Sequence, residues 1–251
     1  MMDLSYQLYS SREFPPLADT LKLLADIGYK SVEAYGGLLD DPDTLDSALS
    51  ASGLSLDSSH VGLDALESKP DWVAEIAQRF GIKSLFCPFL MSDQRPETAD
   101  GWREFGARLG RIDETFSSNG VRVGWHNHDF EFVPLPTGER PMDLILEGAP
   151  SLQWEADVAW IVRGGVDPMA YLQKYGDRIT ALHIKDIAPA GNCADEDGWA
   201  DVGHGTMDWS ALLKAASTLN VKHYVMEHDK PNDHERFARR SFASVQAILE
   251  S

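Results

Sequence analysis

The stretch from 121 to 132 gathers chemically reactive side chains directly behind an apolar run. Residues 121–125 read as a short buried strand. Polar residues then follow almost without interruption: His126, Asn127, His128, Asp129 and Glu131. Burying so many ionisable groups together is costly unless they are paired or bind something. Imidazoles and carboxylates can move protons and can bind divalent metals, so this stretch indicates a catalytic or metal-binding site.

Three later apolar runs also end in ionisable residues, at 152–157, 179–186 and 223–229. We take Asp157, His183 and Glu227 from these runs as three ligands of one divalent ion. Mixed carboxylate and imidazole ligands suit Mn²⁺, Zn²⁺, Co²⁺ or Fe²⁺, whereas an all-oxygen shell would favour Mg²⁺ or Ca²⁺.

The elements that must position these residues alternate between strand and helix. Apolar runs predict strands at 4–9, 30–35, 54–60, 84–89, 121–125, 152–157, 179–185 and 223–227. Helical spacing and caps predict helices at 15–27, 43–52, 70–80, 100–118, 141–147, 168–175, 208–219 and 233–249. Strict alternation favours a parallel sheet, and eight repeats favour its closure. No GxGxxG motif follows the first strand, which argues against an open dinucleotide-binding sheet.

We therefore predict one (β/α)8 TIM barrel, forming a single domain over residues 1–251. The length agrees with the roughly 250 residues typical of this fold. Active sites of such barrels lie at the carboxyl ends of the strands. Polar residues do fall late in the predicted strands: Glu33, His60, His126, His128, Asp157, His183, Lys185 and Glu227. Residues 188–205 show no period and are expected to form a functional or mobile loop.

The composition limits the kinds of partner. Lys plus Arg is 22 and Asp plus Glu is 40, a formal charge of −18 that disfavours nucleic acid. No apolar run approaches the ~18 residues of a membrane span. The N-terminus has no basic or apolar leader, and Cys87 and Cys193 form no CxxC pair. We expect a cytoplasmic enzyme that binds neither nucleic acid nor membrane.

Taken in order, five segments resemble the xylose isomerase-like barrels of the sugar-phosphate isomerase/epimerase type: 126–132, 157–160, 183–186, 202–209 and 226–228. The resemblance covers nearly the whole chain. Members of this family include D-tagatose 3-epimerase, inosose dehydratase and 3-dehydroshikimate dehydratase, and the more distant endonuclease IV shares the fold.

The resemblance implies one metal ion held by Glu, Asp, His and Glu from strands five to eight. Asp157, His183 and Glu227 match the last three ligands. The epimerases carry the first Glu inside strand five, where this chain has glycine and tryptophan. We expect Glu131 to supply this ligand from just beyond the strand, with His126 or His128 as the alternatives.

The implied chemistry is proton abstraction next to a carbonyl through a metal-stabilised enediolate, on a ketose, keto-sugar or cyclitol. Glu227 would act on one face of the substrate, and Glu131, His126 or His128 on the other. A histidine-rich site also suits β-elimination, so a dehydratase or lyase is the alternative. A non-catalytic sugar-binding barrel and an endonuclease IV-like phosphodiesterase are less favoured, the latter because of the −18 charge and the missing extra ligands.

Lys185 is expected to neutralise an enolate or hold an anionic substrate group, unless it pairs with Asp186 or Glu155. Trp160 lies where related epimerases place a substrate-binding histidine, and is expected to stack on a sugar face. The turn around His204 could also form a phosphate cradle. A homodimer is expected by analogy. The full set of expected substrate contacts is His60, Asn127, Trp160, Lys185 and His204.

Overall fold

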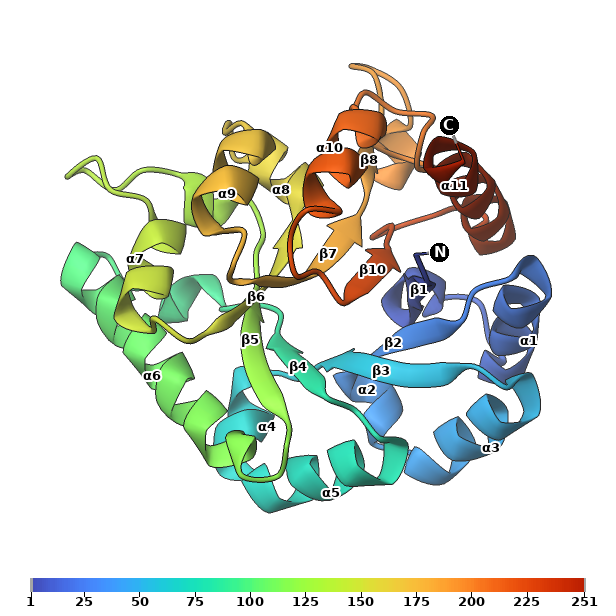
Figure 1. Ribbon diagram of the computed structural model, residues 1–251, viewed down its shortest axis with the longest axis horizontal. Helices are drawn as coiled ribbons and strands as arrows, with labels where there is room; N and C mark the ends of the chain where they lie inside the picture. Colours follow the sequence, from blue (N-terminus) through green and yellow to red (C-terminus); the bar gives the residue numbers. More distant parts are fainter. Residues whose placement is uncertain (1, 251) are drawn as a thin grey trace.

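The computed structural model describes residues 2–250, and within them eight parallel strands close into a barrel (Figure 1). Around the barrel the strand order is β1-β10-β7-β6-β5-β4-β3-β2. The strands are β1 (Leu4–Gln7), β2 (Ser31–Tyr35), β3 (Ser55–His60), β4 (Ser84–Cys87), β5 (Arg122–His126), β6 (Gln153–Asp157), β7 (Ile179–Ile184) and β10 (His223–Met226). Each lies where the apolar runs predicted a strand, and the predicted TIM barrel is confirmed.

Helices form an outer layer around the barrel (Figure 1). The eight predicted from sequence are α1 (Leu17–Ile27), α3 (Pro42–Ser52), α5 (Pro70–Phe80), α6 (Ala99–Ser117), α7 (Pro141–Gly148), α9 (Pro168–Tyr175), α10 (Trp209–Ala216) and α11 (His234–Leu249). Proline opens several of them, because its fixed φ suits the first helical turn and its missing N–H is not needed there. Gly53 and Gly81 end α3 and α5 with a left-handed φ.

Strand register brings the polar strand ends to one edge of the barrel. His126 of β5 lies opposite Glu155 of β6, and Asp157 of β6 lies opposite His183 of β7. Alternate residues of a strand point to opposite faces, so Glu155 and Asp157 share one face of β6. Matched register therefore aligns their side chains with those of the neighbouring strands.

Some short elements had no sequence signal. These are α2 (Gly36–Leu39), α4 (Leu63–Ser68) and α8 (Val158–Arg163), together with the 3-10 turns η1 (Leu8–Ser11), η2 (Ser92–Gln94), η3 (Phe130–Phe132) and η4 (Ala194–Glu196). A helix of four to six residues contains too few apolar positions to establish a period. None of the helices within residues 2–250 is both long and apolar enough to cross a membrane.

The expected loop at 188–205 is more ordered than its composition suggested. β8 (Asp186–Ile187), just before the loop, pairs antiparallel with β9 (Trp199–Ala200) inside it. The Asp186 carboxylate accepts hydrogen bonds from the backbone N–H groups of Gly203, Gly205 and Met207. These bonds tie the loop to the end of β7 and leave the Gly203–Gly205 amides already bound to an internal anion.

Candidate active site

Four buried residues at the carboxyl ends of the barrel strands could hold one metal ion. His126 ends β5, Asp157 ends β6, His183 lies near the end of β7, and Glu227 follows β10. One ligand atom from each lies within 4.8 Å of all the others. All four residues are at most 4% exposed. Two imidazoles and two carboxylates form a donor set suited to Zn²⁺, Mn²⁺, Co²⁺ or Fe²⁺.

A second group of the same kind overlaps the first. It consists of His60, His126, Glu155 and His183. Oxygen Oε2 of Glu155 lies 2.6 Å from Nε2 of His60, 3.0 Å from Nδ1 of His126 and 3.3 Å from Nε2 of His183. Three imidazoles thus surround one carboxylate oxygen at the base of the site.

The carboxylates set the charge of these imidazoles. Burial alone would lower the pKa of His60, but the carboxylates of Glu33 and Glu155 raise it to about 10. The pKa of His183 is likewise raised well above its usual value by Glu155 and Glu227, against the effect of burial. Burial and then the nearby His183 lower the pKa of His126 well below its usual value. The cluster therefore holds charged and neutral imidazoles side by side.

Lys185 supplies a buried positive charge next to the ligand carboxylates. Its Nζ lies 2.6 Å from Asp229 Oδ2, 3.1 Å from Glu227 Oε2 and 3.5 Å from Asp157 Oδ2. Burial alone would lower the pKa of Lys185, but these three carboxylates raise it above its usual range. The pairing with Asp186 or Glu155 considered from the sequence is absent from the ion pairs among the described residues.

The carboxylate of Asp157 fits a metal ligand. Its Oδ2 is buried and has no hydrogen-bond partner among the described residues. Burial raises the pKa of this carboxyl to about 6, although Lys185 acts in the opposite direction. A buried carboxylate oxygen that has only a long ion pair with Lys185 and no hydrogen bond is costly, and a bound divalent cation would remove that cost.

Glu131 lies outside both groups. Its carboxylate accepts hydrogen bonds from Nε1 of Trp125 at 2.9 Å and from the backbone N–H of His128 at 3.0 Å. It sits in η3, where the chain has already turned away from β5. The structure therefore brings His126, one of the two alternatives, to the position that the sequence had assigned to Glu131. The reason is that the side chain of the last β5 residue points into the barrel.

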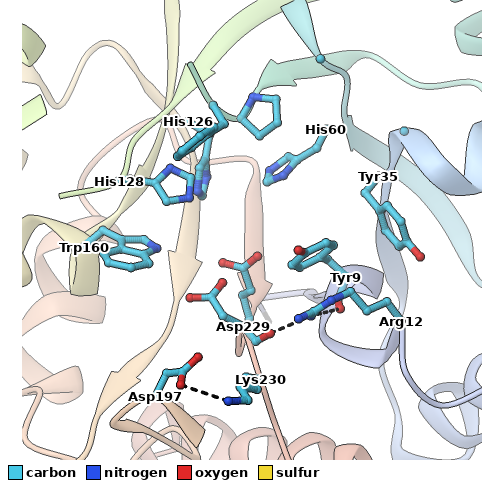
Figure 2. Close-up of a pocket in the computed structure, with 15 residues that line it drawn as sticks. Tyr9, Arg12, Tyr35, His60, His126, His128, Trp160, Asp197, Asp229 and Lys230 are labelled. Carbon is cyan, nitrogen blue, oxygen red and sulfur yellow. Dashed lines mark hydrogen bonds and ion pairs between the residues drawn. The ribbon is translucent and has the colours of Figure 1, made fainter. Parts of the chain in front are cut away.

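A cavity of about 550 Å³ opens beside the first group of possible ligands, which we call the metal group: His126, Asp157, His183 and Glu227 (Figure 2). His126 and Glu227 belong both to the metal group and to the cavity wall. His128 and Trp160 lie on one side of the cavity, and Tyr9 and Tyr35 lie on the other (Figure 2). The cavity therefore borders the metal group and has aromatic side chains on two sides.

Two of the predicted site residues, the catalytic candidate His128 and the substrate contact Trp160, present polar atoms without a hydrogen-bond partner among the described residues. Nδ1 of His128 and Nε1 of Trp160 are buried and have no hydrogen-bond partner within residues 2–250. Both side chains line the cavity, with ring centroids 5.2 Å apart. Burial, with a smaller effect from Lys185, lowers the pKa of His128 to about 3, so this ring is neutral. His60 also lines the cavity and is 7% exposed.

Asn127 and His204 lie elsewhere. The Asn127 side chain is bonded to β6, accepting from Trp154 Nε1 at 2.9 Å and from Asp157 N at 3.1 Å. It thereby fixes the backbone that carries Asp157. His204 is exposed, and its Nε2 lies 3.4 Å from Ser244 Oγ on α11, away from the residues that line the cavity.

A model of the xylose isomerase-like TIM barrel family matches residues 21–247. The chain belongs to this family. An inosose dehydratase of Lacticaseibacillus casei is 24% identical over an alignment of 181 residues that covers 64% of this chain and 60% of that protein. The chain thus matches less than two thirds of the length of this relative.

Two solved structures illustrate the shared fold of the xylose isomerase-like family. A sugar phosphate isomerase/epimerase of Parabacteroides distasonis has a TM-score of 0.81 at 22% identity, covering 98% of this chain and 94% of that one. The IOLI protein, solved with a bound zinc atom, has a TM-score of 0.73 at 17% identity, covering 99% and 96% of the two chains. At this level of identity the likeness establishes the barrel and leaves the chemistry to the site itself.

In this member of the xylose isomerase-like family, two further carboxylates, those of Glu155 and Glu33, contact the histidines of the site. Glu155 was considered from the sequence only as an ion-pair partner of Lys185, and Glu33 only as a polar residue late in its strand. Glu155 lies two positions before Asp157, so period-two alternation placed it on the same inward face of β6. The contact of Glu33 with His183 had no such local signal, because β2 and β7 lie far apart in the barrel order.

Proposed function

We propose that this protein is a divalent-metal-dependent enzyme that isomerises or epimerises a ketose, keto-sugar or cyclitol. The observation that carries the proposal is the buried group of His126, Asp157, His183 and Glu227 beside the cavity. The zinc of the IOLI protein and the described activity of the Parabacteroides protein support a metal and a sugar-like substrate. We also propose that residues 1–251 act as one domain and associate as a homodimer.

The four residues of this group would hold the ion. When bound, a divalent ion supplies a positive charge that polarises a carbonyl oxygen and acidifies the neighbouring C–H bond. Lys185 keeps its shortest contact, 2.6 Å, with Asp229, a residue outside the group. Its ammonium can therefore remain beside the site and balance the excess of carboxylates.

Glu227 is the first candidate for moving the substrate proton. Burial alone would raise its pKa, but Lys185 and His183 lower it well below its usual range, so the carboxylate is ionised. It also lines the cavity and can accept a proton directly from a bound substrate. We assign the opposite transfer to His128, which lines the cavity and whose ring lies 5.2 Å from that of the metal-binding His126.

The cavity wall suits a polyhydroxylated ring. The buried Nε1 of Trp160 can donate to a hydroxyl, and Nδ1 of His128 can accept from one. Tyr9 is 39% exposed and Phe89 is 40% exposed, and both line the cavity. Exposed aromatic faces stack well on the apolar face of a sugar, so a small sugar or cyclitol is the proposed substrate class.

Dehydration of a keto-cyclitol or keto-acid is the second candidate. It is favoured by the inosose dehydratase relatives and by His60. His60 lines the cavity, and its pKa of about 10 keeps the ring protonated. It could therefore protonate a departing hydroxyl while Glu227 accepts the proton next to the carbonyl.

The deciding experiment begins with elemental analysis of the purified protein before and after chelation. We expect about one Mn, Zn, Co or Fe per chain, and a severe loss in the Asp157→Asn, His183→Ala double variant. Metal content equal to wild type in that variant would place the site elsewhere. The metal-loaded protein is then incubated in deuterated water with keto-sugars and inososes, and the products are analysed by mass spectrometry.

Deuterium incorporation without loss of water indicates epimerisation or isomerisation. Loss of one water, with a new near-ultraviolet absorbance, indicates dehydration. A protein that neither contains nor takes up metal would contradict the metal mechanism and leave a binding protein or a metal-free acid–base enzyme.

A further inference from the structure

Glu33 is a buried carboxylate that the proposed mechanism does not use. It lies in β2 and is 0% exposed. Gln7 of β1 donates a hydrogen bond to its Oε1 at 2.8 Å, and Ser58 of β3 donates to its Oε2. The two strands that flank β2 thus fix the carboxylate in place. Neither partner carries a charge, so the negative charge must be balanced from another side.

Two imidazoles balance it: His60, whose Nε2 lies 3.2 Å from Glu33 Oε1, and His183, which comes from the other side of the barrel and makes the shorter contact. The geometry of His183 bears on the metal group. Nε2 of His183 lies 2.8 Å from Glu33 Oε1, and its Nδ1 lies 2.9 Å from Glu227 Oε2. The ring therefore sits between two carboxylates, with a different nitrogen facing each. Glu155 is also near Nε2, at 3.3 Å, but it lies closer to His60 and His126.

The two nitrogens of His183 cannot play the same role once a metal is bound. A neutral imidazole has one N–H donor and one lone pair. An ionised carboxylate only accepts, so the nitrogen facing Glu33 must carry the hydrogen. The lone pair is then on Nδ1, the nitrogen that faces Glu227. Metal-binding histidines usually donate their second ring nitrogen to a carboxylate or carbonyl in this way.

We propose that Glu33 is a positioning residue that fixes the orientation of His183 so that its Nδ1 binds the metal. This inference rests on the proposed metal function. It also selects between the two overlapping groups. The ion is bound by the group that contains Asp157 and Glu227. In the other group, His60 and Glu155 hydrogen-bond to each other instead of binding the ion. Glu33 belongs to neither group, and both of its oxygens already accept hydrogen bonds.

The first test measures the affinity for Zn²⁺ alone, by competition with a chelator, in wild type and in Glu33→Gln. Glutamine keeps the size and an accepting oxygen but removes the negative charge behind His183. We expect the Zn²⁺ affinity to fall on the order of 10- to 100-fold. Glu196→Gln is the matched control, because it removes the charge of another buried glutamate, which pairs with Arg236 outside both groups, and its affinity is expected to equal that of wild type.

The second test identifies the nitrogen that binds the metal. Wild-type protein containing ¹⁵N-labelled histidine is loaded with Zn²⁺ and studied by NMR. We expect His183 to show a metal-bound Nδ1 and a protonated Nε2. A purely structural role of Glu33 would not dictate this pattern, and the measurement decides the matter even if Glu33→Gln fails to fold.

The outcomes separate this inference from the proposed function. Wild type that takes up no Zn²⁺ would overturn both. Wild type that binds Zn²⁺, with Glu33→Gln binding equally well, would overturn the positioning role alone. Metal bound through Nε2 of His183 would also overturn it, because Glu33 would then face the metal rather than an N–H group.

Discussion

At the scale of single residues, the site contains several charged side chains that are buried from water. Lys185 is 0% exposed and lies within 3.5 Å of three carboxylates, while His183 lies between Glu33 and Glu227. Buried charges are tolerated when each has a partner, and removing one partner leaves the other uncompensated. Conservative substitutions that keep the size of the side chain are therefore the informative ones.

Glu227→Gln should separate catalysis from folding. Glutamine preserves the volume but cannot accept the substrate proton and is a poorer metal ligand. We expect kcat to fall on the order of 10²- to 10⁴-fold, measured as the rate of substrate proton exchange in deuterated water. Glu75→Gln, on the exposed face of α5, makes the same chemical change far from the cavity and should leave the rate unchanged. Near-normal turnover in the Glu227 variant would remove this residue from the mechanism.

Glu131 should make stability depend on pH. Burial raises its pKa to about 8, from an ordinary value near 4.5. The folded protein then binds more protons than the unfolded chain between these two values, so this residue's contribution to stability is full below about pH 4.5 and falls as the pH rises toward 8. Glu131→Gln lacks this titration.

The comparison is the free energy of unfolding of wild type and Glu131→Gln, from urea titrations at pH 5 and pH 8. Wild type should lose on the order of 2–4 kcal/mol relative to the variant over this range. A constant difference between the two proteins would mean that Trp125 and the His128 N–H stabilise the ionised carboxylate fully.

At the scale of elements, the turn before α10 depends on close approach to Asp186. The N–H groups of Gly203 and Gly205 both donate to Oδ2 of this residue. A Cβ on Gly205 would lie 2.1 Å from Asp186 Oδ1 and 2.5 Å from the carbonyl oxygen of Ile187. Only glycine allows the two segments to pack this closely.

Gly205→Ala should therefore destabilise the protein by about 1–3 kcal/mol, the usual cost of forcing extra volume into a packed site. Thermal unfolding monitored by circular dichroism would measure it. Gly62→Ala is the control, since a Cβ at Gly62 meets no atom within 4 Å. Equal melting temperatures for the two variants would show that the turn moves aside at little cost.

At the scale of the whole molecule, the barrel should remain folded without metal. The His and carboxylate side chains of the site pair with one another in the absence of an ion, as in the contacts of His183 with Glu33 and Glu227. A ligand that binds only the folded state stabilises it by about 2.7 kcal/mol at 100 times its Kd. For a chain of this size that corresponds to roughly 5–10 °C in Tm.

We accordingly expect chelation to lower Tm by that amount while the far-ultraviolet circular dichroism at 25 °C stays the same. Readdition of the metal should restore Tm, whereas readdition of NaCl at equal ionic strength should not. Loss of secondary structure on chelation would mean that the ion is part of the fold, and an unchanged Tm would mean that no ion binds the folded state tightly.

The sequence by itself determined the order and number of the barrel elements. Apolar runs, helical spacing and glycine or proline at the ends are local signals, and they placed α5 and α9 at the bounds that the structure has. They also placed Asp157, His183 and Glu227 at strand ends, and the closed barrel brought these three together.

Only the tertiary structure decided which other side chains join them. The turn after β5 directs Glu131 toward Trp125 and leaves His126 facing the barrel interior. Closure of the sheet brings Glu33 of β2 to His183 of β7, a contact across 150 positions. Local periodicity fixes which face of its own strand a side chain occupies, but its partners depend on register and closure between strands distant in sequence.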